Sequence, residues 1–127
     1  MNLLLDTQAF IWFVEDDKNL PKSVKQKLED EKNILYISIA SLWEMAIKVS
    51  LGKLKLVDGL QKVIENIDSN GFAIVGIETN HIIHLGSLAY HHRDPFDRII
   101  ASQCSSEKFT IVSSDEIFDK YKVKRIW

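Results

Sequence analysis

Short apolar runs alternate with segments of helical periodicity along this chain. Runs at residues 2–5, 34–39, 72–77 and 109–112 have the length and apolar character of buried strands. Helical patterns occupy residues 7–15, 21–30, 41–52, 59–69, 79–89 and 94–108, and a short helix at 115–120 leads into residues 123–127. Strands that alternate with helices predict an α/β fold, in which a mostly parallel sheet has helices on both faces.

Capping residues predict where several of these helices begin and end. Ser41 and Glu44 form a capping box, in which Glu44 reaches back to the backbone of Ser41. Thr79 is a suitable N-cap, and so is Asp94, which a proline follows. Gly52 is expected to end the helix that Ser41 begins.

The composition indicates a globular chain with a sizeable core. Its 127 residues are 46% apolar and 27% charged, which suits one domain spanning residues 1–127. The single cysteine, Cys104, cannot form an internal disulfide and is expected to pack in the core. Four aromatic residues at helical positions are expected there too: Phe10, Trp12, Phe13 and Trp43.

Charge and hydropathy exclude some classes of partner. The net charge of −2 argues against binding nucleic acid through the overall field of the protein, although basic clusters near Gly52 and the C-terminus leave a local face open. No apolar run approaches the roughly 18 residues of a membrane span, and the first residues contain no basic leader. We therefore expect a cytoplasmic protein that does not enter a membrane.

Acidic residues follow three of the predicted strands. Asp6 comes after the first run, Glu44 after the second and Asp115 after the last, while Asp97 opens the helix that precedes the last run. If the strands are parallel, the residues that follow them gather at one edge of the sheet, where open α/β folds place their sites. Four carboxylates at one edge would repel one another unless cations held them.

Each acid also has a simpler explanation as a helix cap or surface ion pair. Asp6 and Asp115 would cap the helices after their strands, and Asp97 would be stabilised by the positive end of a helix dipole. Glu44 precedes Lys48 by four residues, which suits an ion pair on the helix surface. Caps are as readily Ser, Thr, Asn or Gly, however, so acids at all of these positions favour a site. Both interpretations can hold together.

Four carboxylates suit a hard divalent cation such as Mg²⁺, held as one ion or as two ions about 3.5–4 Å apart. Metal-activated water would then hydrolyse a phosphodiester bond without a protein nucleophile. Neighbouring hydroxyl groups could position water or phosphate, from Thr7, Ser113 and Ser114. Lys48 and Arg98 could contact phosphate, although ion pairs with Glu44 or Asp94 explain them equally well.

Distinct short motifs lie along the whole chain: Leu4-Leu5-Asp6-Thr7, Ser41-Leu42-Trp43-Glu44-Met45-Ala46-Ile47-Lys48, Leu51-Gly52-Lys53-Leu54, His92-Arg93-Asp94-Pro95-Phe96-Asp97-Arg98, Ser114-Asp115 and Ile126-Trp127. In combination they resemble the PIN-domain nucleases, and more closely the VapC-type toxins of toxin–antitoxin pairs. Ser113-Ser114-Asp115 departs from the Thr-x-Asn or Thr-x-Asp of many members, keeping a hydroxyl without its methyl group.

The resemblance implies a three-layer PIN-like fold with a sheet of four or five strands and a metal site at its C-terminal edge. It implies an endoribonuclease dependent on Mg²⁺ or Mn²⁺, whose acids are Asp6, Glu44, Asp97 and Asp115. Asp94 is an N-cap before proline and is therefore not expected to contact the metal. The implied partners are an RNA substrate, a cognate antitoxin protein and a second copy of the chain in a homodimer.

Two other functions remain open. A phosphoacceptor receiver domain also uses acids at strand ends, but it needs an acidic pair after the first strand, where Asp6 stands alone. A PIN-like binding module with little or no nuclease activity would keep the acids only to bind metal weakly. Among the histidines, His91 and His92 are expected in a polar loop beside the acids, and His81 and His84 on a helix surface.

Overall fold

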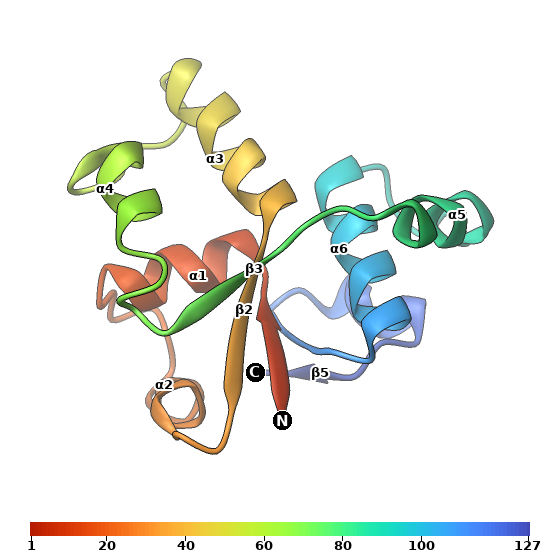
Figure 1. Cartoon of the computed structure of the whole chain (residues 1–127), viewed down its shortest axis with the longest axis horizontal. Helices are drawn as coiled ribbons and strands as arrows, with labels where there is room; N and C mark the ends of the chain where they lie inside the picture. Colours follow the sequence, from red (N-terminus) through yellow and green to blue (C-terminus); the bar gives the residue numbers. More distant parts are fainter.

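Five parallel strands form the centre of the computed structural model, which describes residues 1–127 (Figure 1). The strands are β1 (Asn2–Leu5), β2 (Ile34–Ser38), β3 (Phe72–Val75), β4 (Thr110–Val112) and β5 (Arg125–Ile126). Their order in the sheet is β3-β2-β1-β4-β5, and all four pairings are parallel. The predicted parallel sheet is confirmed.

Helices cover both faces of this sheet and give three layers. One face carries α1 (Thr7–Val14), α2 (Lys22–Glu29), α3 (Ile39–Ser50) and α4 (Gly59–Glu65). The other carries α5 (Thr79–Ser87), α6 (Pro95–Glu107) and the 3₁₀ helix η1 (Glu116–Tyr121), as Figure 1 shows from the side of β3. None of these helices combines the length and apolar character needed to cross a membrane.

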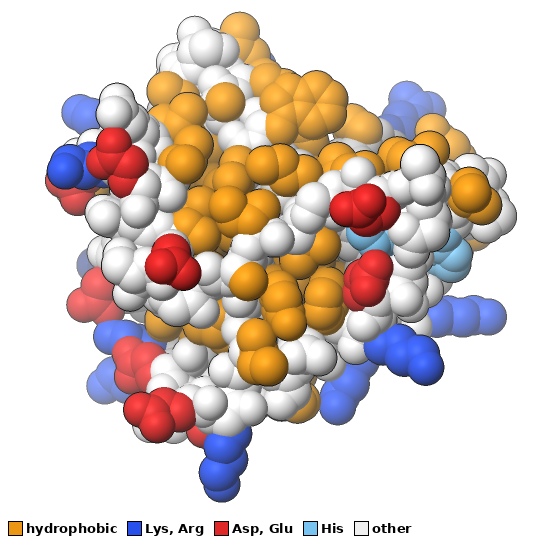
Figure 2. All heavy atoms as spheres, viewed as in Figure 1, with side chains coloured by type: hydrophobic (Ala, Val, Ile, Leu, Met, Phe, Trp, Pro, Cys, Tyr) orange, Lys and Arg blue, Asp and Glu red, His pale blue; other side chains and the backbone are white.

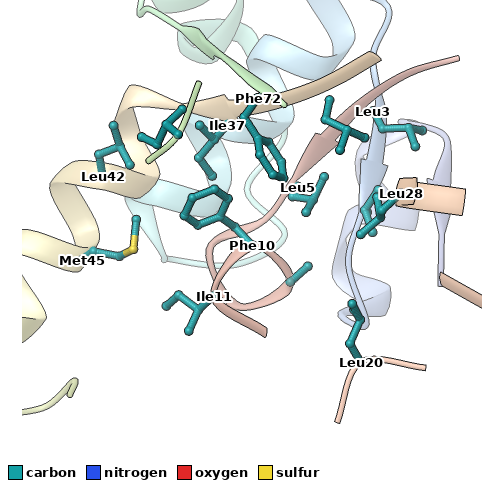
Figure 3. Packing of buried hydrophobic residues seen from close by; sticks show 14 of the residues in the cluster. Leu3, Leu5, Phe10, Ile11, Leu20, Leu28, Ile37, Leu42, Met45 and Phe72 are labelled. Atoms are coloured by element: carbon teal, nitrogen blue, oxygen red, sulfur yellow. The ribbon is translucent and has the colours of Figure 1, made fainter. Parts of the chain in front are cut away.

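The three consecutive leucines of β1 explain why helices must cover both faces of the sheet. Successive side chains of a strand point to opposite faces, so Leu3 and Leu5 pack with α1 and α2 while Leu4 packs with α6 and η1. All three leucines are fully buried. Figure 3 shows the first of these cores, where Phe10 of α1 meets Phe72 of β3 edge to face, with 5.0 Å between ring centroids.

The strand order reverses at β1. The chain passes from β1 to β2 and β3 in one direction across the sheet, and then returns to place β4 on the other side of β1. In open parallel sheets, the C-terminal ends of the strands form a crevice at such a reversal. The residues that follow β1 and β4 are Asp6 and Ser113, and they therefore lie side by side.

Two predicted helix starts, at Ser41 and Thr79, are wrong, because α3 and α5 begin earlier in the chain than the sequence pattern indicated. Ser38 caps α3 and its Oγ accepts the backbone N–H of Ala40 at 3.1 Å, so Ser41 and Glu44 form no capping box. Glu78, rather than Thr79, caps α5. The prediction for α6 is confirmed, since Asp94 accepts backbone N–H groups of its first turn at 2.9 and 3.2 Å.

Burial confirms part of the predicted core. Phe10 and Cys104 are buried, and Trp12 and Phe13 pack half-buried against the first core. Trp43, by contrast, is 60% exposed, because its position on α3 faces away from the sheet; the ring of Phe96 lies 5.2 Å from its own, between centroids. Figure 2 shows hydrophobic side chains spread over this side of the molecule, around α3 and β3.

His81 also differs from its prediction. It is 1% exposed rather than on the helix surface. Its Nδ1 accepts the backbone N–H of Glu78 at 2.9 Å, and its Nε2 lies 2.8 Å from a carboxylate oxygen of Glu107 on α6. The imidazole therefore joins α5 to α6, a contact between helices that periodicity along one helix cannot reveal.

Candidate metal centre

A hollow of about 250 Å³ opens at the C-terminal ends of β1 and β4, and none of the side chains that line it is hydrophobic. The four predicted acids line it together, although they come from distant parts of the chain. The lining residues are Asp6, Thr7, Gln8, Glu44, Lys48, Asp94, Asp97, Ser114 and Asp115.

Asp6 is held at the point where β1 passes into α1. Its backbone N–H donates to Val112 of β4 at 3.1 Å, and its Oδ1 caps α1 by accepting the N–H of Ala9 at 2.8 Å. Its Oδ2 accepts a hydrogen bond from Ser113 Oγ. Burial raises the pKa of Asp6, hydrogen bonds from Ser113 and Ala9 oppose this, and nearby carboxylates raise it further.

Glu44 reaches the hollow from the second turn of α3 and is only 6% exposed. Its Oε1 accepts from Thr7 Oγ1 at 2.7 Å, and its Oε2 accepts from Lys48 Nζ at 2.6 Å. The Thr7 hydroxyl also lies 2.9 Å from Ser41 Oγ. Both oxygens of this buried carboxylate thus have partners, as a buried charge requires.

Asp97 lies in the first turn of α6, one turn from the cap residue Asp94. Burial is the largest cause that raises the pKa of Asp97 to about 7. The charges of four other carboxylates add to it, in decreasing order those of Asp94, Asp6, Glu44 and Asp115. The hollow therefore contains more negative charge than its one lysine neutralises, and a cation would be stabilised there.

The segment after β4 contributes one buried and one exposed hydroxyl. Ser113 is fully buried, and its Oγ accepts the N–H of Asp115 at 3.0 Å while donating to Asp6. Ser114 and Asp115 are exposed, and Asp115 Oδ1 caps η1 through the N–H of Ile117 at 3.0 Å. Ser113 thus holds two acids in place, whereas Ser114 is the hydroxyl open to a ligand.

The two predicted phosphate contacts differ in position. Lys48 lines the hollow, and its hydrogen bond to Glu44 raises the pKa of its ammonium group. Arg98 is 6% exposed and does not line the hollow; its guanidinium donates to the carbonyl oxygens of Ala89 at 2.9 Å and Leu88 at 3.2 Å. A contact between Arg98 and RNA stays a prediction that this burial does not favour.

Family membership follows from the match of sequence to a known domain. The family model of the PIN domain matches residues 3–124, which include β2, β3 and β4 and all of β1 except its first residue. This chain belongs to the PIN domain family. No curated protein matches it.

Solved structures share the fold of this PIN domain at low identity. VapBC2 from Rickettsia felis, bound to a DNA fragment from its promoter, is 20% identical with a TM-score of 0.75, over 99% of this chain and 98% of the other. DNA-bound VapBC from Salmonella typhimurium is 18% identical with a TM-score of 0.74, over 99% and 97%. VapBC-1 from nontypeable Haemophilus influenzae is 15% identical with a TM-score of 0.75, again over 99% and 97%.

The acidic hollow of this PIN domain fits a divalent cation by donor type and charge. Carboxylate and hydroxyl oxygens are the ligands that Mg²⁺ and Mn²⁺ prefer. As the side chains stand, no three Asp, Glu, His or Cys residues are arranged to hold one ion together. Oxygens of Asp6 and Glu44 are instead bonded to N–H and O–H groups of the chain. Binding would therefore require carboxylates to exchange these partners for the ion.

Three features of this region were not part of the predicted site. Gln8 lines the hollow and lies in the first turn of α1. Its position two residues after Asp6 in the sequence could have indicated this. Asp94 lines the hollow while also capping α6. His92 Nε2 lies 3.4 Å from Asp97 Oδ2, a contact that the adjacent sequence positions only suggested.

Proposed function

We propose that this PIN domain is an endoribonuclease that depends on Mg²⁺ or Mn²⁺. Asp6, Glu44, Asp97 and Asp115 would hold the metal, which supplies an activated water and neutralises charge on the phosphate. The observation that carries the proposal is the meeting of these four acids in one polar hollow, with the pKa of Asp97 raised to about 7 by burial and by the neighbouring charges.

Other residues of the chain would prepare the hollow for this chemistry. Thr7 and Lys48 hold the two oxygens of Glu44, and Ser113 holds Asp6, so these side chains orient the acids. The exposed hydroxyl of Ser114 is available to water or to a phosphate oxygen. RNA as the substrate rests on the resemblance to VapC-type toxins.

We further propose that the protein is a cytoplasmic VapC-type toxin that forms homodimers and binds a cognate antitoxin. The shared fold with chains of the VapBC complexes supports this assignment. The exposed apolar side chains around Trp43 also support a protein partner, because soluble monomers rarely expose large contiguous apolar surface. If a short reading frame lies immediately upstream of the gene, co-expression of its product should relieve the toxicity of this protein.

Cleavage of RNA by the purified protein tests the nuclease. Replacing Asp6 or Asp97 by Asn keeps the size of each side chain and its ability to accept a hydrogen bond, so the fold should persist. Both variants should lose cleavage in Mg²⁺ or Mn²⁺, because each removes a charged ligand of the metal, while the exposed control Asp68→Asn should cleave as the wild type does. Retained cleavage by folded Asp6→Asn or Asp97→Asn protein would refute the assigned site.

The alternative is a PIN-like binding module with little or no nuclease activity. The observation in its favour is that carboxylate oxygens of Asp6 and Glu44 already have partners within the chain. Calorimetry distinguishes the two functions: a nuclease should bind Mn²⁺ and cleave RNA, whereas wild-type protein that is inert towards varied RNAs and binds no Mn²⁺ would favour the module.

A further inference from the structure

The phenol oxygen of Tyr121 lies among three nitrogen atoms at the end of η1. The backbone N–H of His92 and Nη1 of Arg98 each lie 3.3 Å from it, and both can only donate. The third nitrogen, Nδ1 of His92, lies closer, at 2.7 Å. Two donors occupy the lone pairs of the oxygen, so the phenol hydrogen points at Nδ1, which must accept it.

This hydrogen bond decides which nitrogen of a neutral His92 carries the proton. If Nδ1 accepts from Tyr121, the ring hydrogen is on Nε2. Nε2 lies 3.4 Å from Oδ2 of Asp97, so its N–H faces the carboxylate. That distance exceeds the usual 2.7–3.2 Å, and a shift of a few tenths of an ångström would give an ordinary hydrogen bond.

Tyr121 is itself held in place from several sides. It is 6% exposed and packs in the second core. The guanidinium of Arg98, which bonds to Tyr121, is anchored by the carbonyl groups of the loop before α6 and lies 3.8 Å from the ring centre of Tyr90. The role of Arg98 is therefore to brace Tyr121 and this loop behind the acidic hollow.

We propose that His92 and Tyr121 are positioning residues for Asp97: Tyr121 holds His92 in the Nε2–H form, and His92 then holds Oδ2 of Asp97 so that the other oxygen remains for a metal ion. The proposal rests on the metal site of the proposed function. Partners that orient a metal-binding carboxylate typically contribute about 10- to 100-fold to metal affinity or activity.

Mn²⁺ binding and RNA cleavage by His92 variants test the role. His92→Ala should weaken Mn²⁺ affinity by about 10- to 100-fold, and His92→Gln, whose amide N–H can replace Nε2–H, should restore most of it. Tyr121→Phe should give a smaller loss. The control is His91→Ala, because His91 is exposed and packs against the Tyr121 ring in a T-shaped arrangement, with 5.0 Å between centroids. A folded His92→Ala protein that binds Mn²⁺ and cleaves RNA as the wild type does would overturn the proposal.

Nitrogen NMR of metal-free protein gives a readout that does not depend on metal. When the ring is neutral, His92 should show a protonated Nε2 and a bare Nδ1, and Tyr121→Phe should remove this preference. A neutral His92 protonated on Nδ1 would overturn the arrangement. Wild-type protein that neither binds Mn²⁺ nor cleaves RNA would defeat the proposed function and the metal-positioning role with it, whereas the NMR result alone decides the Tyr121–His92 hydrogen bond.

Discussion

Replacing Asp97 by Asn should stabilise the metal-free protein at pH 8. The folded protein raises the pKa of Asp97 from 3.8 to about 7, first through burial and then through the neighbouring carboxylates. Between pH 4 and pH 7 the folded state keeps a proton that the unfolded state has lost, so stability falls as the pH rises through this window. Above pH 7 the carboxylate is charged in both states, and its full destabilising effect is present.

The size of this effect follows from the shift. A change of about three pKa units corresponds to roughly 4 kcal/mol, which is an upper limit because the Asp97 side chain is 23% exposed and water screens part of the repulsion. About 2 kcal/mol remains after this discount, or roughly 6–10 °C in Tm for a chain of this length. The amide oxygen of Asn can still accept a hydrogen bond from His92, so the substitution removes the charge alone.

Urea unfolding in EDTA at pH 8 and pH 5 measures the effect. Asp97→Asn should be more stable than the wild type at pH 8. The gain should be smaller at pH 5, where Asp97 is protonated in the folded state but already charged in the unfolded state, and it should vanish only below pH 4. The control Asp68→Asn makes the same substitution at an exposed position and should change stability at neither pH. The reasoning fails if Asp97→Asn gains nothing at pH 8, or gains as much at pH 5.

Two further predictions concern the polar contacts that support the fold. Thr7→Val removes the hydroxyl that donates to Glu44 at 2.7 Å and should cost about 1–3 kcal/mol of unfolding free energy by urea denaturation, whereas Thr7→Ser should recover most of it. His81→Ala leaves a cavity and removes the acceptor of the Glu78 backbone N–H, so it should lower stability by about 2–4 kcal/mol in calorimetry. His84→Ala, on the outer part of the same helix, should cost little by comparison.

Three of the four predicted acids that line the hollow could be identified from local sequence because they stand next to the start of a helix. An apolar run as short as β1, followed by Asp6, indicates a strand end, and parallel strands bring their ends to one edge. Glu44 was predicted from the apolar run before it, yet it lies in the second turn of α3 rather than at the strand end. The capping box offered as its simpler explanation is absent, because Ser38 caps this helix. Glu44 nevertheless reaches the hollow, because its carboxylate extends to Thr7, which lies just after β1.

The supporting contacts could not be derived in the same way. Thr7 and Glu44 are 37 residues apart, and Ser113 and Asp6 are 107 residues apart, so each hydrogen bond depends on which strands become neighbours. The same is true of His81, which was predicted on a helix surface although it is buried against α6. Local periodicity describes one helix, whereas burial depends on the element that packs against it.

The sequence alone therefore determined the alternation of strands and helices, the parallel sheet and the residues that reach its C-terminal edge, because these depend on periodicity and on residues next to one another. Only the tertiary structure decided the strand order β3-β2-β1-β4-β5, which brings Asp6 and Ser113 together at the reversal. It also decided the crowding that raises the pKa of Asp97 and the contact between Tyr121 and His92. Charge repulsion and hydrogen bonding act over a few ångströms in space, regardless of separation along the chain.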